Sequence, residues 1–341
     1  MKFEDLLGNE VVLDLLRSGR LPQASVFCGP EGIGKKTSAL LLAALANCKA
    51  PSGNDLCGRC ASCFKAQGGN HPDIRLYQPE GASDSIKIEA MREMSREAQY
   101  RPFEGKLRFF IIDEAEKMNE AAANSILKTL EEPPETSRLI LISSAPQRLL
   151  ATIRSRCQLF RFQPLTRKQI VDALNRQGHQ EEAGRRASFA EGSLGQALSL
   201  DLGQAAADRD HVLGLLASWR KHSSFLRLFE ACEKEPMRSD LKKRDRVKQF
   251  LHQLQILAQD LYFLQVGSDG RVANQDRLAD LQELAQGIEL DWISRFLYHV
   301  AEAQRDLGRY VSPLMCFETL WLQCRSGSER GFHAADRYRQ V

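Results

Sequence analysis

The sequence predicts an α/β core with a parallel sheet and a cysteine-rich insertion, followed by a small helical unit and a larger all-helical domain. Three observations support this fold class. Short apolar strands alternate with helices over residues 1–162, a glycine-rich loop joins the first strand to a helix, and no strand pattern follows residue 205. Strands that alternate with helices are typical of a parallel sheet covered on both faces.

The composition restricts the class of protein. A chain of 341 residues is too long for one ordinary core, so two or three domains are expected. The formal net charge of +3 is too small for a histone-like coat of DNA, and a contact with nucleic acid would need a local patch or partner subunits. The start of the chain is acidic and lacks an apolar signal core. Nine cysteines without a secretion signal then indicate thiols or a metal site in the cytoplasm, with no membrane span.

Apolar runs and turn signals predict the elements of the core in order. Five strands are predicted, at Ser25–Cys28, Asp73–Tyr77, Leu107–Ile112, Arg138–Ser143 and Gln158–Phe162. The main helices are predicted at Thr37–Asn47 and Asn119–Glu132, and Pro133 and Pro134 end the second one. Residues 1–162 therefore form one predicted domain.

The remainder of the chain is predicted to be helical. Residues 163–205 form a small unit, and residues 206–328 form a larger domain with helices at 276–287, 291–308 and 313–324. Its clearest apolar stripe at helical spacing consists of Val247, Phe250, Leu251, Leu254, Leu257, Ala258 and Leu261. The polar residues 329–341 are predicted to be a disordered tail.

A glycine-rich loop between the first strand and its helix has the spacing of a phosphate-binding Walker A motif. Its residues are Gly29, Gly32, Gly34, Lys35, Lys36 and Thr37. The glycines let backbone N–H groups converge on phosphate oxygens, and Lys35 would contact the phosphates. The motif requires a hydroxyl directly after this lysine as a magnesium ligand, but Lys36 stands there and Thr37 lies about 100° further around the helix. ATP with Mg²⁺ is thus a possible ligand of a degenerate site; the alternative is a glycine-rich turn without a ligand.

A second motif ends the strand that leads to Asp113. The apolar run before Asp113 and Glu114 is typical of Walker B, in which the aspartate faces magnesium and the glutamate faces the attacking water. Acids at strand ends are often only helix caps, so this motif gains its meaning from the upstream loop. In a degenerate site the catalytic role of Glu114 is doubtful.

Four cysteines lie close together after the first long helix. Cys48, Cys57, Cys60 and Cys63 offer four thiolates, which is the ligand set of tetrahedral structural zinc. The segment 48–63 is too short and polar to bury a core of its own, so a metal would hold it together. Four protein ligands leave no open position for a substrate. The alternative is four free or buried thiols, as is expected of the other, scattered cysteines.

These motifs together resemble the clamp-loader family of bacterial DNA polymerase III, of gamma/tau and delta-prime type. The resemblance rests on the cysteine insertion after the Walker A helix, on the run from Asp113 to Pro134, and on Arg154–Cys157. The resemblance is strong over residues 1–200, and beyond them it extends only to the helical architecture. It implies an AAA+ core, a helical lid over 163–205 and a helical collar over 206–328 that joins subunits into a ring.

The resemblance also implies roles for single residues. Arg156 would be an arginine finger that reaches the gamma phosphate held by a neighbouring gamma/tau subunit, unless it only pairs within its own domain. Ser143 or Ser144 would be the phosphate sensor, unless it is a strand-end cap. Active gamma/tau subunits carry an arginine after the Ser-Leu pair of the lid, where this chain has Gly195. Position 36 thus lacks the hydroxyl and position 195 lacks the arginine of an active ATPase, and both positions belong to the same cleft. These two losses favour a delta-prime-like subunit with weak or absent ATP hydrolysis of its own.

The implied partners are gamma/tau and delta subunits, and the sliding clamp and primed DNA through the complex. Two other readings stay open. An active gamma/tau-type ATPase would need a hydroxyl at position 36 and an arginine at 195. A zinc-dependent nucleic-acid-binding module would need a basic, aromatic surface, but Phe64 is the only aromatic residue near Lys49, Arg59 and Lys65.

Overall fold

The computed structural model divides into two compact units, Met1–Leu200 and Asp201–Val341. It describes residues 2–18, 21–81, 84–190, 192–221, 240–286, 288–308 and 311–326. The predicted tail at 329–341 lies outside these residues, as does Cys232. No helix in the described ranges is long and apolar enough to cross a membrane.

The first unit contains a five-stranded parallel sheet, as the alternating pattern predicts. Its strands are β1 (Ala24–Cys28), β2 (Ile74–Tyr77), β3 (Arg108–Ile112), β4 (Ser137–Ser143) and β5 (Gln158–Arg161), in the order β2-β3-β4-β1-β5. Every pairing is parallel. All five carboxyl ends therefore meet at one edge, where open α/β sheets bind ligands.

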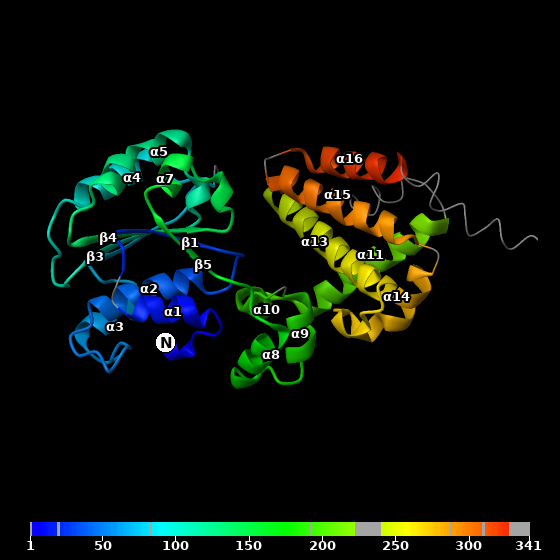
Figure 1. Cartoon of the computed structure of the whole chain (residues 1–341), viewed down its shortest axis with the longest axis horizontal. Helices are drawn as coiled ribbons and strands as arrows, with labels where there is room; N and C mark the ends of the chain where they lie inside the picture. Colours follow the sequence, from blue (N-terminus) through cyan, green and yellow to red (C-terminus); the bar gives the residue numbers. More distant parts are fainter. Residues whose placement is uncertain are drawn as a thin grey trace, which may run out of the picture. The chain divides into compact units, whose positions relative to one another are not determined.

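Helices cover both faces of the sheet (Figure 1). One face carries α1 (Glu10–Arg17), α2 (Lys35–Ala46) and α3 (Ala61–Gln67), and the other carries α4 (Ile88–Glu97), α5 (Glu120–Ser125) and α7 (Ala151–Arg154). Alternate residues of β3 explain the two layers: Phe109 and Ile111 pack with α2, whereas Phe110 and Ile112 pack with α4 and α5.

The predicted helix Asn119–Glu132 is divided in the structure. Asn119 caps α5 by accepting a hydrogen bond from Ala122 N, and α5 ends at Ser125. A second helix, α6 (Leu127–Glu131), begins after Ile126. The hydroxyl of Ser125 donates to the carbonyl of Ala122 at 2.7 Å, and such local side-chain bonds compete with the helical ladder.

Three short helices complete the first unit. They are α8 (Arg167–Arg176), α9 (Ala183–Phe189) and α10 (Leu194–Ser199). Thr166 and Gln169 form a capping box that starts α8. Ile170, Leu174 and Ala197 share one small core within the first unit, and these three helices are here called the lid.

The second unit is all-helical over its described residues. Its helices are α11 (Leu202–Lys221), α13 (Asp240–Gln265), α14 (Leu278–Ala285), α15 (Leu290–Gly308) and α16 (Pro313–Ser326). Short 3-10 turns are η1 (Phe3–Asp5), η2 (Ala115–Lys117) and η3 (Pro146–Arg148) in the first unit, and η4 (Asp269–Arg271) and η5 (Gln275–Arg277) in the second. The predicted stripe on α13 is buried, with Phe250 only partly so, and it packs with α15. The predicted boundary at 205 falls inside α11, and the domain boundaries stay predictions.

Candidate functional site

The glycine-rich loop lies at the carboxyl edge of the sheet, between β1 and α2. Gly29, Gly32 and Gly34 all have positive φ, at 145°, 71° and 96°. A Cβ on Gly29 would lie 2.3 Å from the carbonyl oxygen of Phe162, so this position requires glycine. The Lys35 ammonium is buried and donates to the loop carbonyls of Gly29, at 2.7 Å, and Pro30. Burial lowers the pKa of Lys35, although nearby carboxylates counteract the effect.

Lys36 contacts the Walker B aspartate. Its ammonium lies 3.2 Å from Oδ2 of Asp113, whose side chain is largely buried. The same oxygen accepts a hydrogen bond from Gln78 Nε2 at 3.4 Å, and Oδ1 accepts one from Glu114 N at 3.1 Å. Both oxygens of the carboxylate are therefore occupied by donors, where an active site of this type holds a metal ion.

Glu114 points to a lysine instead of the phosphate loop. Its backbone is in the left-handed region, with φ 49°, which is uncommon for a residue other than glycine. Its carboxylate pairs with Lys117, and Lys117 also binds Asp84 at 2.7 Å. The structure thus places the predicted water-activating carboxylate in an ion-pair network.

The two serines at the end of β4 are brought next to the loop. The carbonyl of Ser143 accepts a hydrogen bond from Gly29 N at 3.3 Å. Ser144 binds Glu116 through its backbone N–H, at 2.9 Å, and through its hydroxyl, at 2.6 Å. Although burial opposes it, these hydrogen bonds hold the pKa of Glu116 below its usual value. Glu116, three positions after Asp113, was not predicted as a site residue, and its charge close to the Walker B motif is the only sequence signal for it.

The lid packs directly on the phosphate loop. Gly195 N donates to the carbonyl of Gly32 at 3.0 Å. A Cβ on Gly195 would lie 3.1 Å from Cα of Gly32, and one on Gly32 would lie 2.2 Å from Oγ of Ser193. A side chain at position 195 would therefore require the phosphate loop or the lid to shift by a few tenths of an ångström. This close approach accompanies the absence of an arginine at position 195.

Arg156 lies at the end of α7 and is exposed. Its guanidinium binds the carboxylate of Glu131, with 2.8 Å between Nε and Oε1, and donates to the carbonyl of Thr152 at 3.0 Å. Within the isolated chain, the predicted finger is thus held by a partner in its own domain.

The four predicted cysteine ligands form one cluster. The sulfur atoms of Cys48, Cys57, Cys60 and Cys63 all lie within 4.8 Å of one another. Two pairs are 3.6 and 3.9 Å apart, close to the edge of about 3.8 Å of a tetrahedron with zinc–sulfur bonds of about 2.3 Å. Cys60 caps α3; desolvation raises its thiol pKa, but backbone and thiol hydrogen bonds lower it to about 6 overall. The cluster therefore has the ligands and spacing for structural zinc.

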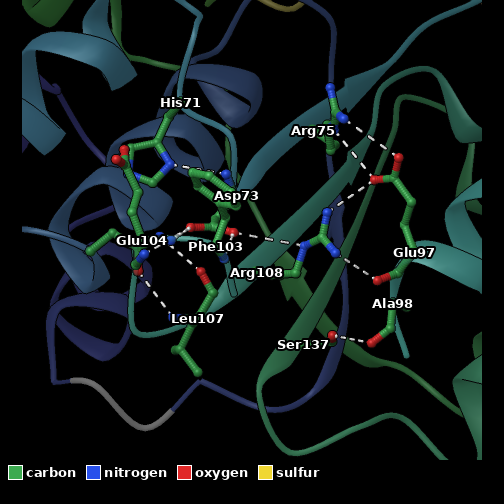
Figure 2. Close-up of polar contacts among 12 residues, drawn as sticks. His71, Asp73, Arg75, Glu97, Ala98, Phe103, Glu104, Leu107, Arg108 and Ser137 are labelled. Atoms are coloured by element: carbon green, nitrogen blue, oxygen red, sulfur yellow. Dashed lines mark hydrogen bonds and ion pairs between the residues drawn. The ribbon is translucent and has the colours of Figure 1, made fainter. Parts of the chain in front are cut away.

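Figure 2 shows a polar network around Asp73 and Arg108. Asp73 is fully buried and accepts backbone hydrogen bonds from Phe103, Glu104 and Gly105 at 2.6, 2.9 and 2.8 Å. Arg108 donates to the carbonyl and carboxylate of Glu97 and lies 3.8 Å from Asp73. The network fixes the loop that leads into β3.

The network also reaches the cysteine segment. Asn47 accepts hydrogen bonds from the backbones of Lys106 and Leu107 at 2.8 and 3.0 Å. Ser62 donates to the carbonyl of Asn47 at 2.8 Å and lies 3.1 Å from Nε2 of His71. None of these contacts was predicted; a polar pair at the start of a predicted strand, His71 and Asp73, was the only signal.

The structure therefore separates the predicted residues into three groups within the first unit. The loop residues, Asp113 and the two serines meet at the carboxyl edge of the sheet, the four cysteines form a cluster, and Arg156 lies at the end of α7. Thr37 lies in the first turn of α2, and Glu114 contacts Lys117. The loop, Asp113 and the two serines thus lie at one edge of the sheet, where the Lys36 ammonium pairs with the Asp113 carboxylate.

Comparison with known proteins agrees with this arrangement. A family model described as "DNA polymerase III, delta subunit" matches residues 10–166. DNA polymerase III subunit delta′ of Bacillus subtilis is 30% identical over 319 residues, which cover 93% of this chain and 95% of that protein. Subunit delta′ of Escherichia coli is 32% identical over 203 residues, which cover 59% of this chain and 61% of that protein.

A second kind of relative matches the first part of the chain. Subunit tau of Escherichia coli DNA polymerase III is 36% identical over 219 residues, which cover 61% of this chain but only 33% of that protein. The delta′ match, in contrast, extends over nearly the whole of both chains. The chain belongs to the family of DNA polymerase III delta′ subunits.

Proposed function

We propose that this chain is the delta′ stator of a replicative clamp loader and supplies Arg156 in trans to a neighbouring gamma/tau ATPase. In this role it helps to load the sliding clamp on primed DNA, together with gamma/tau and delta subunits. Its own cleft hydrolyses ATP weakly or not at all. The observation that carries the proposal is the ion pair of Lys36 with Asp113 in the place of a magnesium site.

The position of Arg156 supports a role outside its own domain. Hydrolysis of a triphosphate needs positive charge at the transferred phosphoryl group, and an arginine from a neighbour is worth about 10³–10⁵ in rate in related enzymes. Arg156 is exposed, and an exposed ion pair such as that with Glu131 is worth at most about 1 kcal/mol. A neighbour's gamma phosphate can therefore replace Glu131 at low cost.

The second unit supports the proposed collar. Leu314, Met315 and Leu322 on α16 are exposed at 41, 57 and 64% of their surface. A cluster of large apolar side chains on one terminal helix is what a subunit interface would bury. We assign residues 206–328 to the collar on this basis, and residues 163–205 to the lid because α8, α9 and α10 share a small core.

The test is reconstitution of the complex with delta and gamma/tau subunits. Arg156→Ala is expected to assemble normally but to lose about tenfold or more of the DNA-stimulated ATP hydrolysis. Arg154→Ala is the matched control, because Arg154 is an exposed arginine two residues before Arg156, at the end of α7. Hydrolysis and clamp loading that are unchanged in Arg156→Ala would remove the finger assignment.

The two alternatives make different predictions. An active gamma/tau-type ATPase would hydrolyse ATP as an isolated chain. The ion pair of Asp113 with Lys36 argues against this alternative. A zinc-dependent nucleic-acid-binding module would bind primed DNA alone, with a strong salt dependence. Of the basic residues near the cysteines, Lys65 is already paired with Glu104 at 2.6 Å, which leaves less positive charge for DNA.

A further inference from the structure

The chain passes from the sheet to the lid through residues 162–166, between the end of β5 and the start of α8. Phe162 N still donates to the last carbonyl of β1, at 2.8 Å, whereas Leu165 is already buried in the core of the lid. Gln163 and Pro164 between them are exposed. A hinge between two packed parts consists of a few connecting residues of this kind.

Asn9 binds this connection from a distant part of the sequence. Its Nδ2 donates to the carbonyl of Gln163 at 3.1 Å, and its Oδ1 accepts a hydrogen bond from Gln163 N at 2.5 Å. One amide side chain thus satisfies both backbone groups of Gln163. Asn9 directly precedes α1, whose Leu13 and Leu16 are buried in the same core as α2. The connection is therefore tied to the α/β core.

The local structure of Asn9 does not account for this arrangement. An asparagine directly before a helix normally accepts a hydrogen bond from an N–H group of the first turn. Asn9 makes no such capping bond, and its backbone is left-handed, with φ 54° and ψ 31°, which is uncommon for a residue other than glycine. Such a conformation persists where a contact elsewhere requires it. The contact here is the one with Gln163.

The three residues before Asn9 contact both parts of the first unit. Leu6 packs against the core beside the sheet, and Leu7 packs against the core of the lid. Gly8 has φ 64°, and a Cβ on it would lie 2.5 Å from Cδ2 of Leu165. This segment therefore lies directly between the α/β core and the lid.

We propose that residues 6–9 form a strap that locks the lid to the α/β core, and that Asn9 closes it by fixing the backbone of Gln163. Leu6 supplies the contact with the core, and Leu7 and Gly8 supply the contact with the lid. None of these contacts involves a ligand, so the strap holds the lid in the isolated chain. The inference goes beyond the proposed function, which concerns Arg156 and a neighbouring subunit.

The experiment is hydrogen–deuterium exchange of the full-length protein, read by mass spectrometry. Asn9→Gly removes both side-chain hydrogen bonds but still permits the left-handed backbone. Amides of α8, α9 and α10 are expected to exchange about tenfold faster than in the wild type, because two hydrogen bonds no longer oppose opening of the lid. Amides of β3 and β4 should keep their wild-type rates.

Asn9→Asp is the conservative variant. It keeps the acceptor for Gln163 N but replaces the donor to the Gln163 carbonyl by an oxygen atom, so a smaller acceleration, of about threefold, is expected in the lid. Asn70→Gly is the matched control, since Asn70 is an exposed asparagine in the turn before β2. It should leave the exchange of the lid unchanged.

Two results would overturn the proposal. The first is a lid in Asn9→Gly that exchanges within about twofold of the wild-type rate. The second is an equal acceleration of the lid and of β3 and β4, since Asn9 would then only stabilise the α/β core. Circular dichroism establishes that each variant is folded; if Asn9→Gly is not, the same two criteria are applied to Asn9→Asp.

Discussion

The cysteine cluster and the phosphate loop lie in the same unit but differ in how their parts are assembled. The cluster draws all four sulfur atoms from a segment of sixteen residues, 48–63, and they converge on one point. The cleft draws its parts from the ends of β1, β3 and β4 and from the lid, and its charged groups bind one another. The four cysteines lie close enough together to bind one metal ion. At the carboxyl edge of the sheet, in contrast, the Lys36 ammonium pairs with Asp113, the carboxylate that would bind a metal ion.

The difference has an energetic basis. Four thiols brought together without a metal gain little from one another, so we expect a zinc ion to stabilise the segment 48–63. The cleft, in contrast, satisfies Lys35, Lys36 and Asp113 internally and needs no ligand to be stable. Metal removal should therefore lower the stability of the cysteine cluster, but it should leave the phosphate-loop region unchanged.

The largest expected effect is at the cluster. Cys63→Ser replaces a buried sulfur ligand, and the free energy of unfolding of the first unit is expected to fall by about 3 kcal/mol or more. That corresponds to a loss of about 6–12 °C in Tm. Zinc content, measured by mass spectrometry, is expected to drop from one ion per chain to none.

Cys157→Ala is the control for that change, because Cys157 is also buried but lies far from the cluster in the sequence and packs on the opposite face of the sheet. It should retain one zinc ion. A Cys63→Ser protein with full zinc content and an unchanged Tm would contradict the assignment of the cluster as a metal site, and the comparison between the two regions would fail.

A smaller effect is expected at Asp73, whose carboxylate holds the backbone of residues 103–105 before β3. Asp73→Asn turns one acceptor oxygen into an NH₂ group that faces backbone donors, so stability should fall by about 2–3 kcal/mol in urea unfolding. Burial opposes ionisation of Asp73, but three backbone N–H groups hold its pKa below its ordinary value.

The sign of the pH dependence follows from that lowered pKa. The charged carboxylate stabilises the fold fully above about pH 4, and this contribution is lost as the pH falls through the lower folded-state value. The difference in unfolding free energy between wild type and Asp73→Asn should therefore be constant near neutral pH and decrease only in strong acid. Asp172→Asn, a substitution at an exposed position on α8, should have the same unfolding free energy as the wild type at every pH. If the difference for Asp73→Asn persists unchanged in acid, the charge of Asp73 is not its origin.

The smallest effect is expected where the lid meets the phosphate loop. Gly195→Arg supplies the arginine that active relatives carry, but its Cβ would lie 3.1 Å from Gly32. The lid must shift, and we expect a loss of about 1–3 kcal/mol, seen as faster proteolysis of the lid. Gly184→Arg is the matched control, since a Cβ there meets no atom within 4 Å. Equal stability of the two variants would show that the close approach does not exclude a side chain.

The sequence predicts those features that depend on short-range pattern. Every strand of the sheet follows from an apolar run, and the cysteine cluster follows from spacing alone, because both signals lie within a few residues. The break at Ile126 was missed, since it depends on one hydroxyl that binds a carbonyl. The pairings of Lys36 with Asp113 and of Glu116 with Ser144 were missed because they join residues 28 or more positions apart and depend on side-chain rotamers.

Asn47 connects the cysteine cluster to the start of β3, a strand that contains no cysteine. It directly precedes Cys48, and its side chain holds the backbone of Lys106 and Leu107, where the chain turns into β3 and toward Asp113. Zinc starvation of a cell would thus loosen more than the cysteine segment. The strand that carries the Walker B aspartate would lose an anchor, so the supply of one metal would affect a nucleotide cleft that has no ligand for it.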